Sequence, residues 1–356
     1  MARLKDVARM ANVSICTASK IINQAKGWDL YTEDCVKRVQ EASRALGYKP
    51  NYHAIALKAG RSQAIGMVMA PLGQNQMHTP FNPGVLMGVD AGAVRSGYHF
   101  IAINPGSESD QISNALKYLR EGRVDGLVVV GSVLDESPSG SIENLENWEY
   151  PIALINYEKE TKLPVIGIDH AGGIRKAMDH LAELGHQCIT YVGPRPNDVG
   201  PAALRHDAFH SSVRERQIES HEILYNDPDF SRVSIGDFIA TVRRVLLDDM
   251  ENAERNATAI LCYNEATALA AYAAMQSLGK SIPEDISIVG FDDIFAPLAW
   301  PPMTVVSHML EAIGQEAIRI IIEMAGDNET WNSFRNYREK IEPELVIRES
   351  TAAPGA

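Results

Sequence analysis

The residues with the clearest chemistry lie at the start of a short helix predicted over residues 15–22. Ile15, Cys16 and Lys20 fall on the exposed first turns of that helix. When such a helix enters the major groove of DNA, side chains at these positions reach the base edges. The apolar tips of Ile15 and Cys16 suit a thymine methyl group, and the Lys20 ammonium group suits guanine or a phosphate. The pattern predicts a DNA-reading helix, with Thr17 in a packing or phosphate contact.

Two short helices joined by a tight bend must position these side chains. A first helix is expected over residues 4–11, and Asn12-Val13-Ser14 forms the bend before the second. Asn12 tolerates a left-handed backbone, and Ser14 is a favourable N-cap. A third helix is expected after Thr32, another N-cap, so that three helices share one apolar centre. The alternative is a helical hairpin that belongs to the core of a larger domain.

The charge of the chain is divided unevenly along its length. A net charge of −13 over 356 residues would oppose DNA binding if it were spread evenly. Residues 1–60, however, hold ten Lys or Arg and five acidic residues, so this part carries +5 and the remainder carries −18. This division is typical of a basic DNA-binding head on an acidic body.

Cysteine usage and hydropathy narrow the class of protein further. The four cysteines, Cys16, Cys35, Cys188 and Cys262, form no closely spaced pair, so neither a disulfide framework nor a zinc knuckle is indicated. No N-terminal apolar stretch follows a basic start, and no run approaches the roughly 20 residues that span a bilayer. We therefore expect a protein of a reducing cytoplasm.

From residue 65 onward, short apolar runs alternate with helical patterns such as 172–184 and 265–278. Continuous apolar strands that alternate with helices indicate parallel sheets covered on both faces. We expect two Rossmann-like lobes, with a ligand beyond the carboxyl ends of the strands, in the cleft between them. The predicted strands are 65–69, 100–103, 127–130, 152–155, 189–192, 223–225, 259–262 and 286–289.

Several motifs in the chain match one known family. In the head they are Leu4-x-Asp6-Val7-Ala8, Val13-Ser14, Gly47-Tyr48-x-Pro50-Asn51 and Gly60-Arg61-Ser62. In the body they include Pro80-Phe81, His180-Leu181-x-x-Leu184-Gly185-His186, Asn264-Glu265-x-x-Ala268-Leu269 and the stretch 283–293. Through these motifs the chain resembles the LacI/GalR family of bacterial transcription regulators, and the match continues almost to the C-terminus.

The resemblance implies a small all-α helix-turn-helix head on an α/β, two-lobed, periplasmic-binding-protein-like body. The implied parts are a DNA-binding domain over 1–50, a hinge helix over 51–60, an effector-binding and dimerisation domain over 61–348, and a tail over 349–356. The tail has no leucine heptads that would assemble a tetramer, so a homodimer on a near-palindromic operator is expected. The implied DNA-binding residues are Ser14, Ile15, Cys16, Thr17, Lys20, Asn23, Tyr48, Asn51 and Leu57, the last inserted between base pairs in the minor groove.

The family also implies a repressor that responds to a small effector bound between the lobes. Arg, Asn and Asp supply paired donors and acceptors for adjacent hydroxyl groups, while aromatic rings cover the apolar side of a sugar. A sugar or sugar derivative is therefore the leading ligand class, a purine or nucleoside is the alternative, and a solute-binding protein with a vestigial head is the rival function. The implied effector residues are Phe81, Asn82, Asn156, Arg205, Phe230, Asn264 and Asp292.

Three features depart from the family pattern. Ile55 stands where Arg is usual in the hinge, and the connection over 26–31 is a few residues longer than usual. Glu265 replaces the Asp that usually follows the Asn at position 264. We expect the first two to affect contacts with DNA and the third to alter a wall of the effector pocket or the crossing between lobes.

Catalytic motifs are absent from the sequence. It contains no glycine-rich dinucleotide or phosphate loop and no nucleophile elbow. Asp169, Asp292 and Asp293 are prominent carboxylates, but nothing in the sequence separates them into an acid and a base. His206 and His210 have the spacing of one helical face, yet no third metal ligand is evident, so we expect a solvent-facing pair. No enzymatic activity, metal or cofactor is predicted.

Overall fold

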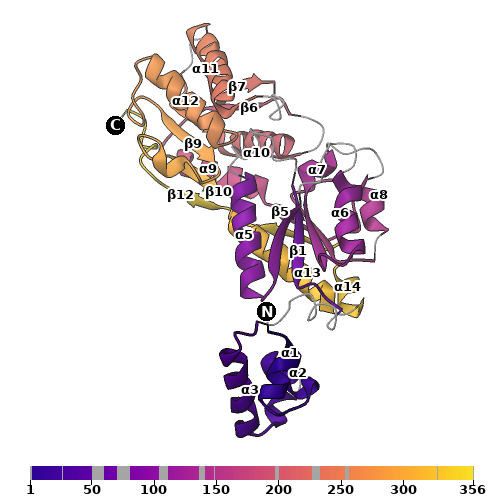
Figure 1. The fold of residues 1–356 in the computed structure, drawn as a ribbon. Helices are drawn as coiled ribbons and strands as arrows, with labels where there is room; N and C mark the ends of the chain where they lie inside the picture. The colour runs from indigo at the N-terminus through magenta and orange to yellow at the C-terminus, as the bar shows by residue number, and fades with distance from the viewer. Residues whose placement is uncertain are drawn as a thin grey trace. The chain divides into compact units, whose positions relative to one another are not determined.

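The computed structural model describes residues 2–25, 27–49, 60–69, 81–103, 111–135, 141–147, 149–196, 200–226, 233–252, 256–326 and 328–355. Three predicted site residues, Asn51, Leu57 and Phe230, and the departure at Ile55 lie outside these ranges. The chain divides into two compact units, Met1–Ser62 and Gln63–Ala356, which we call the head and the body. Each unit is described by itself (Figure 1).

In the described residues of the head there are three α-helices, α1 (Leu4–Met10), α2 (Ile15–Ile22) and α3 (Glu33–Ala45), with a short 3-10 helix, η1 (Trp28–Leu30), before α3. Asn12 has a φ of 53° in the bend, as its residue type predicts. The N-caps of α2 and α3 are the predicted Ser14 and Thr32. The small apolar core consists of Val7, Ala8, Ala11, Ala18, Ile21, Val39 and Ala42.

The part of the body that the structure describes contains two six-stranded sheets, which define a first lobe and a second lobe. The first sheet has the order β11-β5-β4-β3-β1-β2, and all its neighbouring strands are parallel. Its strands are β1 (Ala64–Val68), β2 (His99–Ile103), β3 (Gly126–Val130), β4 (Ile152–Ile155), β5 (Val165–Ile168) and β11 (Arg338–Ile341). Strands β1, β3, β4 and β5 are buried along their whole length, because helices cover both faces of the sheet.

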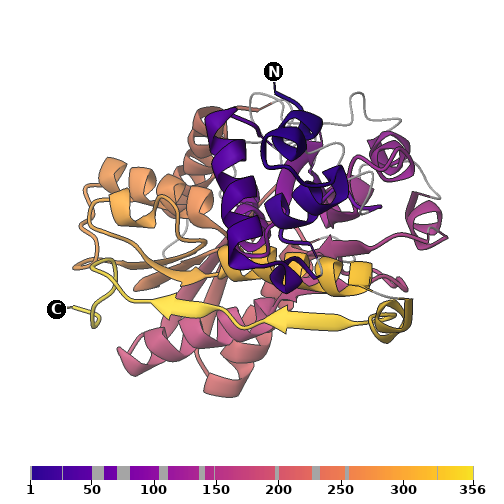
Figure 2. The ribbon, with the colours of Figure 1, turned by 60° about the horizontal axis from the view of Figure 1, so that its bottom comes forward.

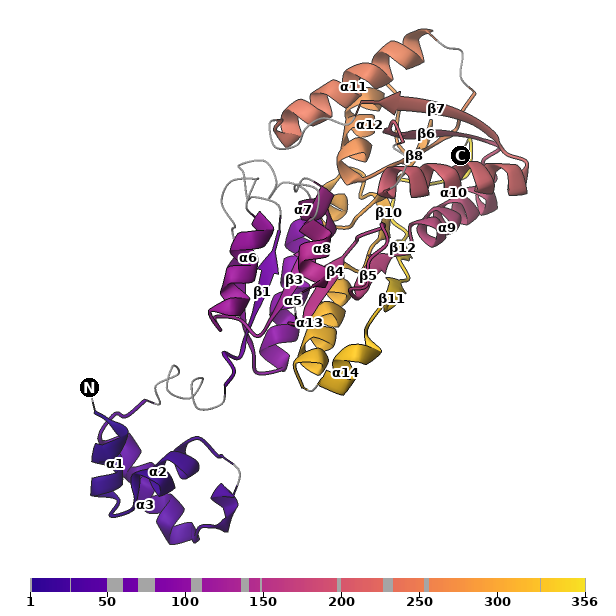
Figure 3. The same ribbon diagram turned by 90° about the vertical axis from the view of Figure 1, so that its right-hand side faces the viewer.

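The second sheet has the order β12-β10-β9-β8-β6-β7 and is parallel except for β12, which runs antiparallel to β10. Its strands are β6 (Cys188–Pro194), β7 (Glu219–Tyr225), β8 (Ala259–Cys262), β9 (Ser287–Phe291), β10 (Thr304–Ser307) and β12 (Glu344–Val346). In Figure 3, α11 and α12 lie on one side of this sheet and α9 and α10 on the other. The helices are α9 (His170–Glu183), α10 (Pro201–Arg216), α11 (Ile235–Asn252), α12 (Glu265–Ser277) and the 3-10 helix η3 (Ala296–Leu298).

Two long helices of the first lobe approach each other closely. A Cβ atom at Gly88 of α5 (Phe81–Arg95) would lie 2.1 Å from the carbonyl oxygen of Glu311 in α13 (Leu310–Gly326). Gly314 of α13 faces the α5 backbone in the same way, because a Cβ atom there would lie 2.5 Å from the Val85 carbonyl oxygen. Glycine at these positions therefore allows backbone contact. The remaining helices of this lobe are α6 (Gln111–Arg120), α7 (Gly131–Asp135), α8 (Ser141–Glu146) and α14 (Asn328–Ser333).

The chain crosses between the lobes three times. It leaves the first sheet after β5 to enter α9, returns after β10 to enter α13, and crosses again from β11 to β12. The last crossing is visible as two successive yellow strands in Figure 2. These three connections are the segments that any rotation of one lobe against the other must bend.

All eight strands predicted from apolar runs are present, with ends that differ by a few residues. The prediction missed β5, β10, β11 and β12. Both β11 and β12 carry exposed charged residues because they are edge strands, so they lack the continuous apolar pattern of a covered strand. No helix in the described ranges is long and apolar enough to cross a membrane.

Candidate functional site

The first turn of α2 presents the predicted reading residues at the head surface. Ser14 caps the helix, since its Oγ accepts a hydrogen bond of 3.0 Å from the backbone N–H of Thr17. The Thr17 hydroxyl lies 2.9 Å from the same oxygen, so this side chain belongs to the cap. Ile15 is 54% exposed, and Cys16 is also exposed. An apolar Ile side chain left in solvent at this position is available for contact with a thymine methyl group.

The other predicted residues of the head take different places. Lys20 is half-buried, one turn after Cys16 on α2. Asn23 is exposed, but its Nδ2 donates a 2.9 Å hydrogen bond to the carbonyl oxygen of Ser19, so the amide folds back onto the helix. Tyr48 packs against the apolar core of the head. The structure therefore places Ile15, Cys16 and Lys20 together on one helix, and gives Asn23 and Tyr48 local structural contacts.

In the body, Arg205 of α10 is the centre of a buried polar cluster. The residue is buried, with only 5% of its surface exposed. The Nε–H donates to Nδ1 of His170 at 3.2 Å, and Nη2 lies 2.8 Å from Nε2 of His308. Nη1 donates to the carbonyl oxygen of Tyr263. The guanidinium also lies between two aromatic rings, 4.6 Å from the ring centre of Tyr263 and 4.7 Å from that of Phe291.

The two histidines that hold Arg205 lie at two of the crossings between lobes. His170 is the first residue of α9, and His308 follows β10. Burial and the nearby Arg205 charge lower the pKa of both imidazoles well below the usual value, so both are neutral. A neutral imidazole that accepts from Arg205 at one nitrogen carries its proton on the other. His170 Nε2–H can then donate to Asn156 Oδ1, 3.4 Å away.

Asp292 lies at the edge of the cluster, beside His308. Its Oδ1 lies 3.4 Å from His308 Nε2, and the residue is 7% exposed directly after β9. Burial raises the pKa of Asp292, while the Arg205 charge opposes that rise. Asp292 has a φ of 75° and Asn156 a φ of 54°, so both residues adopt a left-handed backbone immediately after a strand. Such strained positions at strand ends occur often in ligand sites.

Asn264 and Glu265 have structural partners within the second lobe. Asn264 caps α12, since its Oδ1 accepts from the Thr267 backbone N–H and hydroxyl, both at 2.8 Å. Glu265 is fully buried, and its Oε1 accepts from the backbone N–H groups of Phe295 and Ala296. The pKa of Glu265 is raised to about 7, mainly by burial and also by the nearby Asp292 carboxylate, while the backbone hydrogen bonds from Phe295 and Ala296 oppose the rise. Glu265 thus anchors the loop that follows β9.

The predicted effector residues are only partly brought together. Arg205 is linked to Asn156 through His170, and Asp292 lies 3.4 Å from His308 Nε2, the nitrogen that faces Arg205. Phe81 packs on the core of the first lobe, and Asn82 is buried on the first turn of α5. The sequence analysis missed His170 and His308. His308 directly follows β10, and one residue separates His170 from the end of β5. That placement, at the carboxyl end of a parallel strand, is the signal that could have identified them.

Comparisons with known protein families find matches in both the head and the body. Residues 3–51 match the model for bacterial regulatory proteins of the lacI family, and residues 178–351 match the periplasmic binding protein-like domain. An HTH-type transcriptional repressor PurR of Aliivibrio salmonicida is 31% identical over 98% of this chain and 99% of its own length. A repressor of the same name from Haemophilus influenzae is 29% identical over 98% of both chains.

Solved structures share the fold. A Lac repressor dimer bound to operator and an anti-inducer superposes with a TM-score of 0.75 at 23% identity, covering 99% of both chains. A CelR–cellobiose complex gives a TM-score of 0.62 at 24% identity over 98% of this chain and 100% of that one. The relatives align over almost their whole length, and the helix-turn-helix head and two-lobed body match the expected architecture. The chain belongs to the lacI family of bacterial regulatory proteins and is a DNA-binding transcriptional regulator.

Proposed function

We propose that this protein is a homodimeric repressor of the bacterial cytoplasm that binds a near-palindromic operator and changes its DNA affinity when a small effector binds between the lobes. The similarity over almost the whole chain to proteins named repressors supports repression rather than activation. The reading turn of α2, with Ile15 and Cys16 exposed, supports sequence-specific contact with base edges. No enzymatic role is proposed, because the family consists of regulators.

The observation that carries effector control is the position of Arg205. A buried guanidinium held by neutral imidazoles and aromatic rings presents a flat set of donors in a site of low dielectric. Asp292 supplies a carboxylate near enough for the Arg205 charge to oppose the rise in its pKa. Together they offer the donors and acceptors that a polyhydroxylated ligand needs. Solved structures of this fold are described with cellobiose and with ribose bound, which supports a sugar or sugar derivative here.

Effector binding would reach the head through the crossings between lobes. His170 and His308 hold Arg205, and each lies where the chain passes from one lobe to the other. A ligand that binds Arg205 and Asp292 in one arrangement of the lobes stabilises that arrangement over the alternative. A change in lobe orientation would alter the spacing of the hinge segments at residues 51–60 across the dimer. The heads would then be held in register on the operator or released from it.

The test begins with the operator. Purified protein is incubated with sheared genomic DNA, and the bound fragments are recovered and sequenced. We expect a shared near-palindrome upstream of genes for the uptake or breakdown of one class of metabolite. Absence of any enriched sequence, both alone and with a panel of sugars and of purines and nucleosides, would contradict sequence-specific regulation.

The same panel identifies the ligand class by thermal shift of the full chain. A sugar that raises the melting temperature and changes operator affinity supports the proposed effector. A purine or nucleoside that does so, with no response to sugars, overturns the sugar assignment and leaves effector control intact.

A further inference from the structure

Two histidines and one glutamate converge on a single point on the side of the second lobe. His206 and His210 are one turn apart on α10, and their Nε2 atoms lie 3.2 Å from each other. Glu222 of β7 places its Oε1 atom 3.0 Å from His206 Nε2 and in contact with His210 Nε2. This arrangement corrects the sequence interpretation of a solvent-facing pair, because the His206 and His210 side chains are only 16% and 33% exposed.

The hydrogen bond between the two histidines leaves the rest of this cluster unsatisfied. If His210 Nε2–H donates to His206 Nε2, the latter has no proton to offer Glu222, and its lone pair faces the carboxylate at 3.0 Å. Glu222 Oε1 is buried and takes part in no hydrogen bond of acceptable geometry within the described ranges. A buried carboxylate oxygen without a hydrogen bond is costly, and a second acceptor aimed at it adds repulsion. A cation between the three atoms removes both costs.

Two of the three separations between the ligand atoms agree with coordination of one small metal ion. The third pair, His210 Nε2 and Glu222 Oε1, is in direct contact and must move apart when an ion enters. Zn²⁺ binds His nitrogen and carboxylate oxygen atoms at about 2.0–2.2 Å, so neighbouring ligand atoms of a tetrahedral site lie roughly 3.3 Å apart. The observed 3.2 Å between nitrogens and 3.0 Å between His206 Nε2 and Glu222 Oε1 are close to that value. The three ligand atoms all lie within 4.8 Å of one another.

The surrounding rings hold both imidazoles in this orientation. The Tyr191 ring packs edge-on against His206, with 5.8 Å between ring centres, and the Phe209 ring packs against His210 at 5.5 Å. His206 and His210 also contact each other edge-on at 4.5 Å. Ligands that are fixed by packing before the ion arrives lose little conformational freedom on binding it.

We propose that His206, His210 and Glu222 bind one divalent transition-metal ion of the zinc type, with water completing the coordination. Two imidazoles and a carboxylate form a ligand set that Zn²⁺ accepts readily. The ion would join α10 to β7 across the face of the second sheet. Because Arg205 directly precedes His206 on α10, the same ion would fix the helix that carries the buried arginine. The proposal rests on this cluster alone and does not depend on the effector assignment.

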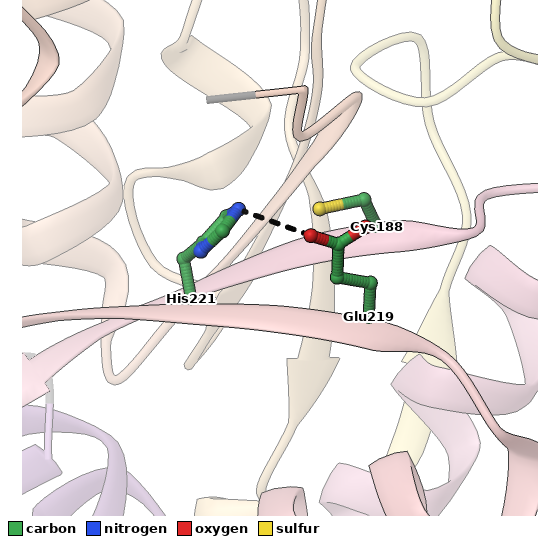
Figure 4. Close-up of side chains that lie close together, drawn as sticks. All are labelled: Cys188, Glu219 and His221. Atoms are coloured by element: carbon green, nitrogen blue, oxygen red, sulfur yellow. Dashed lines mark ion pairs between the residues drawn. The ribbon is translucent and has the colours of Figure 1, made fainter. Parts of the chain in front are cut away.

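A second group on the same strand provides a contrast within the chain. Cys188, Glu219 and His221 lie close together (Figure 4), and strand alternation puts Glu219 and His221 on the face of β7 opposite Glu222. Asn256 satisfies this group. Its Oδ1 accepts from Cys188 Sγ at 3.2 Å and lies 3.4 Å from His221 Nε2, and its Nδ2 donates to Glu219 at 3.1 Å. These side chains need no ion, so we assign none to them.

The test measures metal binding directly on the full chain. Protein stripped with a chelator and dialysed is titrated with Zn²⁺, and bound zinc is counted by elemental analysis. We expect one ion per chain. His206→Gln and Glu222→Gln should each weaken binding by at least about a hundredfold, because even partners outside the coordination shell cost 10- to 100-fold. The matched control, His221→Gln, removes a histidine from the opposite face of β7 and should bind zinc as the native chain does.

Cobalt gives a second readout that separates the two groups. Co²⁺ bound by His206, His210 and Glu222 should show visible ligand-field bands without a thiolate-to-cobalt charge-transfer band. That charge-transfer band, or loss of binding in His221→Gln but not in His206→Gln, would overturn the proposal in favour of the Cys188 group. Failure of the native chain to bind either ion at 100-fold molar excess would overturn it outright. Melting temperatures of the metal-free variants verify that each is folded.

Discussion

Glu265→Gln tests how burial controls the ionisation of the carboxyl group beside the arginine cluster. Glu265 is fully buried, and its Oε1 accepts two backbone N–H groups from the loop after β9. Its Oε2 is buried without a hydrogen-bond partner among the described residues. A glutamine can keep the accepting oxygen in place but never ionises. The variant therefore removes the cost of charging the side chain while it retains the anchor of the loop.

The size and sign of the effect follow from the pKa. Burial raises the pKa of Glu265 from 4.5 to about 7. The folded state then holds a proton that the unfolded state has lost, so stability falls as pH rises from 4.5 through 7. The difference of about 2.5 pKa units corresponds to roughly 3 kcal/mol of unfolding free energy, most of it between pH 5 and pH 8. Above about pH 8 the penalty is complete and no longer changes.

The assay is thermal unfolding of the native chain and Glu265→Gln at pH 5 and pH 8. We expect the difference in melting temperature, variant minus native chain, to be several degrees larger at pH 8 than at pH 5. A change of 1 kcal/mol shifts the midpoint of a 150–250-residue unit by about 2–4 °C. Glu344→Gln, at an exposed position of the same lobe, serves as the control and should show no such gain. If the melting temperatures of the native chain and Glu265→Gln differ by the same amount at pH 5 and pH 8, the reasoning is refuted.

Three further substitutions test the head and the first lobe. Ser14→Ala removes the N-cap of α2 and should lower head stability by about 1 kcal/mol, measured by chemical denaturation, with weaker operator binding; an unchanged midpoint would contradict the cap. If the Lys20 ammonium group contacts a phosphate, Lys20→Ala should reduce the slope of log operator affinity against log salt concentration by about 1. Loss of preference for one base at an unchanged slope would instead identify a guanine contact. Gly88→Ala places a Cβ atom 2.1 Å from the Glu311 carbonyl oxygen and should cost about 1–3 kcal/mol through forced separation of α5 and α13; a native melting temperature would show that the helices are not tightly packed.

The head was predictable because its signals are local. Asn12 at the bend, Ser14 and Thr32 at the caps, and the apolar spacing of each helix all act within a few residues. The covered strands were equally evident, because burial on both faces demands continuous apolar runs. The edge strands β11 and β12 depend instead on pairing with β5 and β10, which lie far away in the sequence. No local pattern indicates such a pairing.

The polar clusters of the body depend on long-range contacts. Arg205 was singled out by resemblance, but its partners His170 and His308 lie 35 and 103 residues away and meet it only through the crossings between lobes. Glu222 is close to His206 and His210 in the sequence, yet it belongs to another element. The side of β7 that it occupies follows from strand alternation and register, which the sequence analysis did not determine. The helical spacing of the histidines was visible, and the third ligand atom was not.

The most direct test of effector control is operator affinity with and without effector for the native chain, Arg205→Ala and Arg214→Ala. Arg214 is an exposed arginine of the same helix, hydrogen-bonded to Ser211, and serves as the matched control. We expect the effector to change the operator affinity of the native chain and of Arg214→Ala by 5- to 150-fold, the usual range for coupled sites. Arg205→Ala should bind the operator as tightly as the native chain in the absence of effector and show no change when it is added. A full effector response in a folded Arg205→Ala protein would contradict the account.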